Sequence, residues 1–180
     1  MRVIAGSLKG RRLKPPTWDG LRPTSDKLRE TLFNILAPRI AGARVLDAYA
    51  GTGAAGIEAL SRGAETVTFV ERDRRAQALI AENLAHCGVA EGYAIIRADM
   101  ARAVDELRAA GLTFDIALFD PPYDQSADRE IAAISDLLAP GGIVVLEHPR
   151  RRASMATAGR LVRSREVASG DSALSFYQLM

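Results

Sequence analysis

The sequence contains little cysteine and histidine, and this scarcity excludes several classes of protein. Cys87 is the one cysteine, so the chain cannot form an internal disulfide. The two histidines, His86 and His148, together with that single thiol fall short of the ligand sets that hold zinc or other transition metals. We therefore expect no bound metal and no disulfide-stabilised fold.

Long apolar runs are also absent. No stretch of 18 apolar residues could cross a bilayer, and the basic N-terminus has no apolar segment of secretory length. Hydrophobic residues make up 48% and charged residues 26% of the 180 residues, which is the composition of a folded globular chain. A chain of this length fits one domain of ordinary size, and we expect it in the cytoplasm, away from membranes.

Charge is distributed unevenly along the chain. Residues 1–40 carry nine Lys and Arg against three Asp and Glu, and residues 149–180 carry six against two, whereas residues 41–148 carry nine against seventeen. Basic clusters supply the sequence-independent part of nucleic-acid affinity, so two basic ends suggest contact with a polyanion. A merely solvated basic surface is the alternative. The candidate RNA-binding residues are Arg2, Lys9, Arg11, Arg12, Lys14, Arg22, Arg150, Arg151 and Arg152.

A segment rich in proline and glycine, residues 14–20, separates an N-terminal arm from the rest of the chain. We accordingly divide the protein into a basic arm with its linker, residues 1–22, and one folded domain, residues 23–180. Short apolar and basic runs around Gly6 and Gly10 are compatible with a small β-hairpin in the arm.

Beyond residue 22 the sequence alternates between helical and strand patterns. Thr24 or Ser25 can cap a first helix, which we expect to end before Pro38. Short apolar runs then alternate with helical stretches, as in parallel βαβ units whose sheet is covered by helices on both faces. The last two runs flank a turn and predict an antiparallel hairpin. We thus expect an α/β, Rossmann-like fold with a mostly parallel, seven-stranded sheet, with strands around residues 45–46, 66–70, 94–96, 116–119, 143–146, 160–168 and 173–180.

A glycine-rich motif follows the first expected strand. Gly51, Gly53 and Gly56 are spaced as in dinucleotide-binding loops, where glycines allow a tight turn and let a ligand approach the backbone at a helix N-terminus. Glu71 follows the second strand, and a carboxylate there can accept hydrogen bonds from both hydroxyls of a ribose. This order of elements predicts a site for an adenosine-containing cofactor. A purely structural turn is the alternative.

Asp47 distinguishes between two kinds of cofactor. An anionic side chain just ahead of the glycines is unhelpful in a loop that must attract a pyrophosphate. The same carboxylate suits S-adenosylmethionine, which carries a sulfonium and an amino group, because it can bind the methionine end directly or through water. The alternative is that Asp47 only accepts local N–H groups and braces the loop.

The tetrapeptide Asp120-Pro121-Pro122-Tyr123 closes the fourth expected strand, near the switch point where open sheets bind ligands. The exocyclic amine of a nucleobase is a poor nucleophile, because its lone pair is delocalised into the ring. The carboxylate of Asp120 and the carbonyl of Pro121 can hold such an amine so that its lone pair points at a methyl carbon, and consecutive prolines keep that carbonyl in place. Tyr123 offers a π-face to a base taken out of its stack. A proline-rich turn with a packed tyrosine is the structural alternative.

These motifs resemble those of the bacterial 16S ribosomal RNA guanine-N2 methyltransferases, which are class I S-adenosylmethionine-dependent enzymes. The glycine loop and the Asp-Pro-Pro-Tyr element are shared by many methyltransferases, so only an N-terminal signature narrows the family. Tyr49, where phenylalanine is expected, and Ala55, where leucine is commoner, are small departures. The resemblance covers nearly the whole chain and is carried by residues 2–6, 10–13, 22–26 and 29–34 of the N-terminal signature and by residues 46–47, 51–53, 58–64, 69–71 and 120–123 of the core.

The resemblance implies methylation of N2 of a guanine in 16S ribosomal RNA, by a monomer that acts on a small-subunit particle. It also places Asp99 at the adenine amino group of the cofactor, although a helix N-cap is the alternative. Arg72 would lie along the adenine unless it is merely solvated. The expected cofactor-binding residues are Asp47, Tyr49, Gly51, Thr52, Gly53, Glu71, Arg72, Asp99 and Met100, and the expected catalytic residues are Asp120, Pro121, Pro122 and Tyr123.

Two other functions remain open at this point. A DNA adenine-N6 methyltransferase uses the same amine chemistry, but it would need a DNA-recognition domain, for which this chain has little room. A protein that binds a nicotinamide dinucleotide shares the glycine motif, but it leaves residues 120–123 unexplained. We expect a structural hydrogen bond for His148, since Asp120 and water suffice to receive a proton, and we assign no role to His86 or Cys87.

Overall fold

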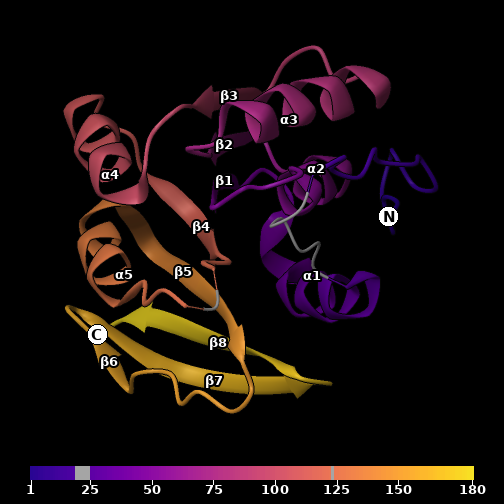
Figure 1. Cartoon of the computed structure of the whole chain (residues 1–180). Helices are drawn as coiled ribbons and strands as arrows, with labels where there is room; N and C mark the ends of the chain where they lie inside the picture. Colours follow the sequence, from indigo (N-terminus) through magenta and orange to yellow (C-terminus); the bar gives the residue numbers. More distant parts are fainter. Residues whose placement is uncertain (19–24, 123) are drawn as a thin grey trace.

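The computed structural model describes residues 1–18, 25–122 and 124–180. At its centre lies one eight-stranded sheet with the strand order β3-β2-β1-β4-β5-β8-β7-β6 (Figure 1). β1 pairs in parallel with both β2 and β4, so the chain changes direction across the sheet beside β1. The strands are β1 (Arg44–Ala48), β2 (Thr66–Val70), β3 (Tyr93–Ile96), β4 (Phe114–Phe119), β5 (Leu138–Pro149), β6 (Thr157–Ala158), β7 (Leu161–Ser169) and β8 (Ser172–Leu179).

The parallel part of the sheet ends at β5, and the antiparallel hairpin of β7 and β8 completes it, as the sequence predicts. The sheet has eight strands instead of the expected seven, because Thr157 and Ala158 pair with the outer edge of β7. A strand of two residues contains no alternation of apolar and polar side chains, so no sequence pattern marks it. The Rossmann-like α/β architecture itself is confirmed.

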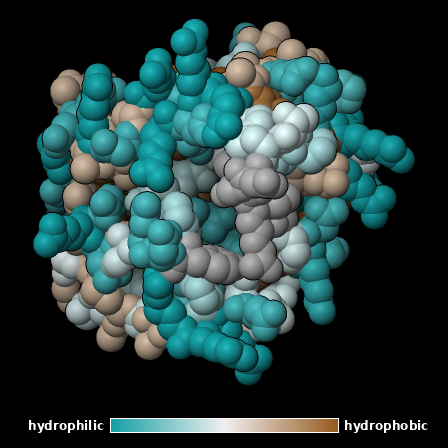
Figure 2. Space-filling view, in the orientation of Figure 1, coloured by the Kyte–Doolittle hydropathy of each residue, from teal (hydrophilic) through white to brown (hydrophobic). Residues whose placement is uncertain are grey.

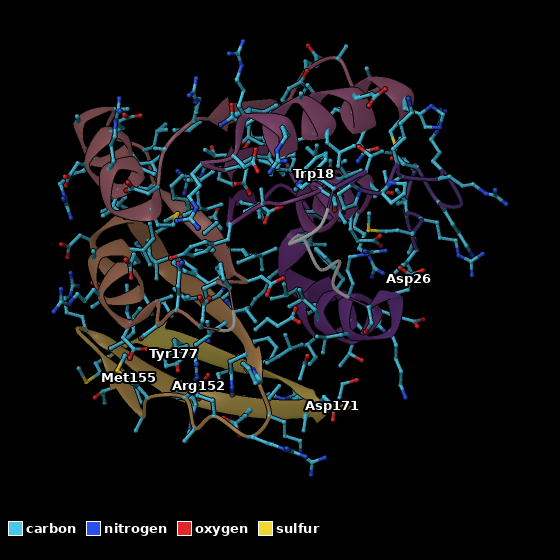
Figure 3. The ribbon with its side chains drawn as sticks, in the orientation of Figure 1. Trp18, Asp26, Arg152, Met155, Asp171 and Tyr177 are labelled. Carbon is cyan, nitrogen blue, oxygen red and sulfur yellow. The ribbon has the colours of Figure 1, made fainter. Side chains whose placement is uncertain are left out.

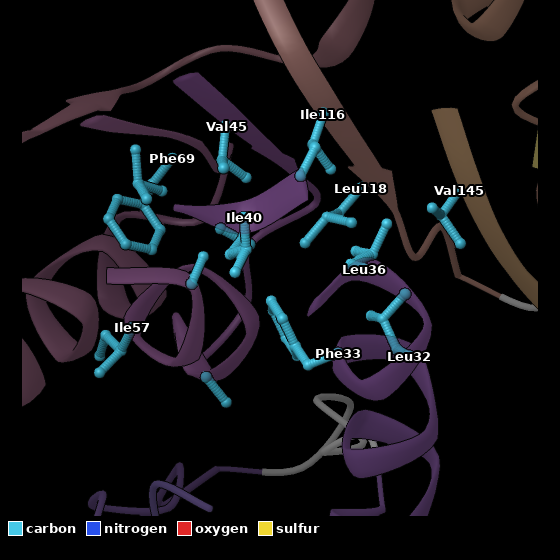
Figure 4. Close-up of a cluster of buried hydrophobic side chains, with 14 of the residues drawn as sticks. Leu32, Phe33, Leu36, Ile40, Val45, Ile57, Phe69, Ile116, Leu118 and Val145 are labelled. Carbon is cyan, nitrogen blue, oxygen red and sulfur yellow. The ribbon is translucent and has the colours of Figure 1, made fainter. Parts of the chain in front are cut away.

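Helices cover both faces of the sheet, and each face has its own apolar cluster, because successive strand residues point to opposite sides (Figure 1). On the first face, Leu32, Phe33 and Leu36 of the first helix pack against Leu118 and Val145 (Figure 4). The helices of this face are α1 (Asp26–Ile40), α2 (Ala54–Ser61) and α3 (Arg74–His86), and those of the other face are α4 (Met100–Ala109) and α5 (Asp128–Ile134), followed by the 3-10 helix η1 (Ser135–Leu137).

Helix α1 begins where the sequence predicts and ends later. Ser25, one of the two expected caps, accepts the Leu28 N–H at 3.2 Å. Pro38 lies inside the last turn, whereas we expected the helix to end before it. The proline removes only one backbone donor there, and Ile40, 4% exposed, continues the buried face of the helix beyond it. Burial of an apolar side chain thus outweighs the local stop signal.

The N-terminal arm folds back on itself and packs against the first face of the fold. Its hairpin is reduced to a single bridge between Arg2 and Arg12, although Val3 and Leu13 are both buried in the core. The buried carboxylate of Glu58 on α2 accepts the N–H groups of the next two arm residues, 4 and 5, at 2.7 and 3.0 Å. The arm is therefore held by apolar burial and by a carboxylate beneath it.

Candidate active site

A cavity of about 1110 Å³ opens at the carboxyl ends of β1, β2, β4 and β5. Pockets for one small ligand usually measure roughly 300–1,000 Å³, so this cavity has room for a cofactor together with part of a second substrate. Trp18 and Asp171 line it from opposite sides (Figure 3). Eleven of the residues predicted from the sequence also line it: Asp47, Tyr49, Gly51, Thr52, Glu71, Arg72, Asp99, Met100, Asp120, Pro121 and Pro122.

Two of the predicted residues stand apart from this group. Gly53 does not line the cavity but caps α2, and its φ of 77° is a left-handed conformation that favours glycine. Tyr123 falls outside the described residues, and so does Arg22 among the basic ones. The structure therefore brings together every other predicted cofactor-binding and catalytic residue.

The glycine loop is shaped by close contacts with its neighbours. A Cβ atom on Gly56 would lie 2.2 Å from the ring of Phe69 on β2, so only glycine lets α2 approach the sheet this closely. Just before the loop, Tyr49 adopts a φ of 61°, which is costly for a bulky residue. Its ring packs edge-on against Phe119, with centroids 6.1 Å apart. Strained backbone of this kind is common where a loop is shaped to hold a ligand.

Asp47 lies beneath the loop and is almost completely buried, with 4% of its surface exposed. Its Oδ2 accepts the N–H of Gly56 at 2.8 Å, so the loop-bracing contact that we considered as an alternative is present. The residue also lines the cavity. Burial raises the pKa of Asp47 to about 8, because desolvation disfavours the carboxylate more than the Gly56 N–H stabilises it. A cation beside Asp47 would reverse this balance.

Glu71 lies at the tip of β2, as predicted, with its carboxylate held by the backbone on two sides. One oxygen accepts the Gly51 N–H at 2.9 Å and the other accepts the Asp73 N–H at 2.8 Å. Each carboxylate oxygen has a second lone-pair direction, so both can still accept a hydrogen bond from a ligand hydroxyl. The contacts of Glu71 therefore fix the orientation of its carboxylate and leave each oxygen able to accept one more hydrogen bond.

The hydrogen bonds of the glycine loop argue against a nicotinamide dinucleotide as the ligand. A loop that binds pyrophosphate offers its N–H groups to the phosphate oxygens. Here the N–H groups of Gly51 and Gly56 donate to Glu71 and Asp47, and that of Gly53 donates to the Ala50 carbonyl at 2.7 Å. The loop thus has two carboxylates against it, and the N–H groups of its three glycines are engaged by the protein itself. Such a donor set suits a cationic cofactor with free hydroxyls and disfavours a pyrophosphate.

Asp99 has the N-cap role that we gave as the alternative, and it also lines the cavity. It caps α4, where its Oδ1 accepts the Arg102 N–H at 2.9 Å, and Met100 beside it lines the cavity as well. Arg72 lines the cavity but is largely exposed. Both residues stand at the β3 side of the opening, beyond Glu71, which is the side that an adenine would occupy if Glu71 holds the ribose.

Asp120, Pro121 and Pro122 follow β4 directly, at the position opposite the glycine loop across the switch point. Asp120 is half-buried, Pro121 is buried and Pro122 is exposed. Because β1 and β4 are neighbours, the loop after each strand contributes one wall of the same cavity. Asp120 and Pro121 thus line the space beside the glycine loop.

Several cavity residues were missed from the sequence. Lys27 and Arg29 contribute from α1, and Glu147 contributes from β5. Glu147 had a detectable signal, because it ends the apolar run 143–146 just as Asp120 ends its own run. The α1 residues carried no such signal, since nothing local shows that the helix turns this side towards the sheet edge.

The predicted basic residues form two separate groups. Arg2, Lys9, Arg11 and Arg12 are exposed on the arm beside α2 and α3, whereas the loop of Arg150, Arg151 and Arg152 follows β5 at the other end of the molecule (Figure 1). Lys14 pairs with Glu82 on α3. Arg152 donates to the Gln125 carbonyl at 2.9 Å, which ties its loop to the segment after Pro122. In the orientation of Figure 1, hydrophilic side chains cover much of the visible surface (Figure 2).

The two histidines and the cysteine lie away from the cavity. His148 is 5% exposed and its Nε2 lies 2.9 Å from the Ser175 hydroxyl, within a network that reaches Glu166. His86 and Cys87 end α3. Among the described residues no group of histidine, cysteine and carboxylate side chains could hold a metal ion, and none of the described helices is long and apolar enough to cross a membrane.

This fold and this site together define a class I S-adenosylmethionine-dependent methyltransferase. A family model described as "Conserved hypothetical protein 95" matches residues 1–178, and the chain belongs to this family. It is 36% identical over 181 residues to "Putative rRNA methyltransferase YlbH" of Bacillus subtilis, covering 99% of this chain and 98% of that protein.

Two further comparisons agree. The chain is 42% identical over 128 residues to "Ribosomal RNA small subunit methyltransferase D" of Escherichia coli K12, and this match spans 68% of the chain and 60% of the relative's length. The solved structure of "Putative methyltransferase yhhF from Escherichia coli" superposes with a TM-score of 0.84 at 35% identity, over 99% of this chain and 97% of the other. The family predicted from the sequence motifs is thus confirmed.

Proposed function

We propose that the protein transfers a methyl group from S-adenosylmethionine to the exocyclic N2 amine of a guanine in 16S ribosomal RNA. The observation that carries the proposal is the shared cavity, in which Asp47 and Glu71 at the glycine loop face Asp120 and Pro121. Relatives named as ribosomal RNA small subunit methyltransferases support the choice of RNA.

The residues present fit this cofactor. Asp47 would hold the cationic methionine end, Glu71 the ribose hydroxyls and Asp99 the adenine amino group, while the loop at residues 49–53 passes beneath them. When bound, the cofactor supplies an electrophilic methyl group on a sulfonium and leaves as the neutral thioether. A buried carboxylate is costly without a cation, so Asp47 supplies a specific reason for a sulfonium cofactor to bind here.

The acceptor side would be held by Asp120 and the Pro121 carbonyl. Two acceptors on one N–H₂ group keep the remaining lone pair of the nitrogen aimed at the methyl carbon, in line with the departing sulfur. Asp120 and Pro121 would thereby align the amine nitrogen with the methyl group that the bound cofactor would supply, whose bond to sulfur would break as the new bond to nitrogen forms. Asp120 or water takes the proton that the methylated amine releases. Positioning is therefore the main task, and Tyr123 would stack on the base.

The two basic groups would bind RNA phosphates on either side of the cavity. We assign this role to the arm residues, including Arg22, and to Arg150, Arg151 and Arg152. The division into an arm, residues 1–22, and a methyltransferase domain, residues 23–180, belongs to this proposal. So do action as a monomer on a small-subunit particle and a cytoplasmic location, where such particles are assembled.

The experiment that tests the proposal is mass spectrometry of 16S ribosomal RNA from a strain that lacks the gene. One N2-methylguanosine should be missing, and the wild-type gene should restore it, whereas the Asp120→Ala variant should not. An RNA with its full set of N2-methylguanosines, or a missing methyl on adenine N6, would reject the proposed target.

A further inference from the structure

The carboxylate of Glu147 lies beside the Asp-Pro-Pro element by virtue of strand register. β4 and β5 are parallel, and Phe119 pairs with Leu146, so Asp120 and Glu147 occupy the next step along the two strands. Neighbouring strands lie about 4.8 Å apart, which puts the two residues at adjacent positions of one sheet edge. Both line the cavity.

The alternation of buried side chains places both residues on the same face. Leu118 and Val145 belong to the apolar cluster on the α1 side, whereas Phe119 and Leu146 belong to the other cluster. One residue further on, strand alternation returns each chain to the α1 side. On its other flank, Glu147 pairs with Leu174 of β8, another member of the α1-side cluster. Glu147 thus stands half-buried between an apolar side chain and Asp120.

Guanine and adenine differ in the hydrogen-bonding group that they present beside the exocyclic amine. Guanine presents an N1–H and an N2–H₂ group side by side, so a carboxylate can accept hydrogen bonds from both. Adenine presents an unprotonated N1 beside its N6 amine, and a carboxylate facing that N1 would meet a lone pair. A carboxylate next to the amine-binding site therefore favours guanine and rejects adenine.

We propose that Glu147 selects guanine by accepting the N1–H of the target base, while Asp120 and the Pro121 carbonyl hold its N2 amine. This inference rests on the proposed guanine-N2 methylation and supplies the specificity that Asp120 lacks, since the Asp-Pro-Pro element suits any exocyclic amine. Reading the base by its Watson–Crick edge requires that it leave the stack, and the cavity of about 1110 Å³ has room for it beside the cofactor.

A base analogue tests the inference directly. The substrate is a small-subunit particle whose target guanosine, once located by mass spectrometry, is replaced by 2-aminopurine. This base keeps the N2 amine but has an unprotonated N1. The wild-type protein should methylate guanosine with a kcat/KM roughly 10- to 100-fold above that for 2-aminopurine, the range of a good base-edge contact.

The Glu147→Gln variant should lose most of this preference, because its amide can donate to an unprotonated N1. In the variant we expect kcat/KM for guanosine to exceed that for 2-aminopurine by no more than about threefold, since the amide can accept from a protonated N1 or donate to an unprotonated one. Glu147→Asp keeps a carboxylate and should keep the preference at a lower rate. Glu91→Gln, which changes an exposed carboxylate that does not line the cavity, should leave the ratio as in the wild type.

Two results would overturn the role of Glu147. One is a wild-type protein that uses both bases equally well, and the other is a folded Glu147→Gln variant with the wild-type ratio. Calorimetric titration with S-adenosylhomocysteine shows that the variants are folded, because their affinities should match the wild type. Failure of the proposed function looks different, because the wild-type protein would then form no N2-methylguanosine.

Discussion

Asn83 on α3 donates a hydrogen bond from its side-chain amide to the carbonyl oxygen of Thr52 in the glycine loop, at 3.1 Å. The same amide accepts the backbone N–H of Lys14 at 2.7 Å and donates to the Lys14 carbonyl at 3.3 Å. Asn83 is completely buried. One side chain therefore joins the end of the basic arm to the loop beneath the cofactor, and the two parts form a single hydrogen-bonded unit.

Asn83→Ala should lower both the stability of the protein and its affinity for S-adenosylmethionine. The substitution leaves the Thr52 carbonyl without this buried partner, at about 1–3 kcal/mol, and it also removes the partly buried bond to the Lys14 N–H. Urea unfolding and calorimetric titration measure the two effects. Asn34→Ala, at an exposed position on α1, should change stability by less than about 0.5 kcal/mol. A folded Asn83→Ala variant with wild-type cofactor affinity would show that the bridge does not shape the loop.

The buried Asp47 makes cofactor binding depend on pH. Burial raises its pKa to about 8, so the carboxyl group of the free protein is mostly protonated at neutral pH. A cationic ligand binds the ionised form, so binding should release a proton, and the affinity for S-adenosylmethionine should rise with pH until about 8 and then level off. Calorimetry in buffers of different ionisation enthalpy counts that proton. Asp47→Asn should bind more weakly and show no such rise, and a wild-type affinity that is flat from pH 6 to 8 would contradict the assignment.

The raised pKa of Asp47 also predicts how the stability of the protein varies with pH. In the unfolded chain an aspartate ionises near pH 3.9, whereas the folded state holds the proton of Asp47 up to about pH 8. The folded state therefore binds more protons between these values, and stability falls as pH rises through this window. Thermal unfolding across pH 4 to 9 should show the wild type losing stability relative to Asp47→Asn, with the difference constant above pH 8. Parallel curves would mean that Asp47 is ionised in the folded protein.

Neutralising Arg11 and Arg12 together should weaken RNA binding and flatten its dependence on salt. Both side chains are exposed on the arm, and each phosphate contact that is lost should reduce the log-log slope by about 0.7–0.9. Replacing Arg102 and Arg108, exposed on α4, provides a matched change of charge. The measurement is RNA affinity over a salt series. Lines of equal slope and height for the wild type and the arm variant would place the RNA contacts elsewhere, at Arg150 to Arg152.

The sequence predicts the strand ends and the residues that follow them, because each is marked by a local pattern. An apolar run that stops at an acid identifies Asp47, Glu71 and Asp120 without any knowledge of the tertiary structure. Contacts between distant residues leave no such mark. Asn83 meets Lys14 across 69 positions, and Glu58 meets Ile4 across 54.

The prediction that helix α1 ends before Pro38 was wrong for a related reason. The stop signal of a proline is local, whereas the burial of Ile40 against the sheet depends on the packing of the whole face. For Glu147 the sequence supplies half of the information. It shows that the residue follows an apolar run, but that Glu147 lies next to Asp120 follows only from the strand order β1-β4-β5.

The most direct test of the central claim is to measure methyl transfer and cofactor affinity together for Asp120→Asn. Asp120 is assigned to the target amine and the glycine loop to the cofactor, so transfer to small-subunit particles should fall by about 100-fold or more while S-adenosylmethionine affinity stays within a few-fold of wild type. Asp105→Asn changes an exposed carboxylate on α4, away from the cavity, and should transfer at the wild-type rate. Full transfer by Asp120→Asn would contradict the account, and so would a loss of transfer explained entirely by a matching loss of cofactor affinity.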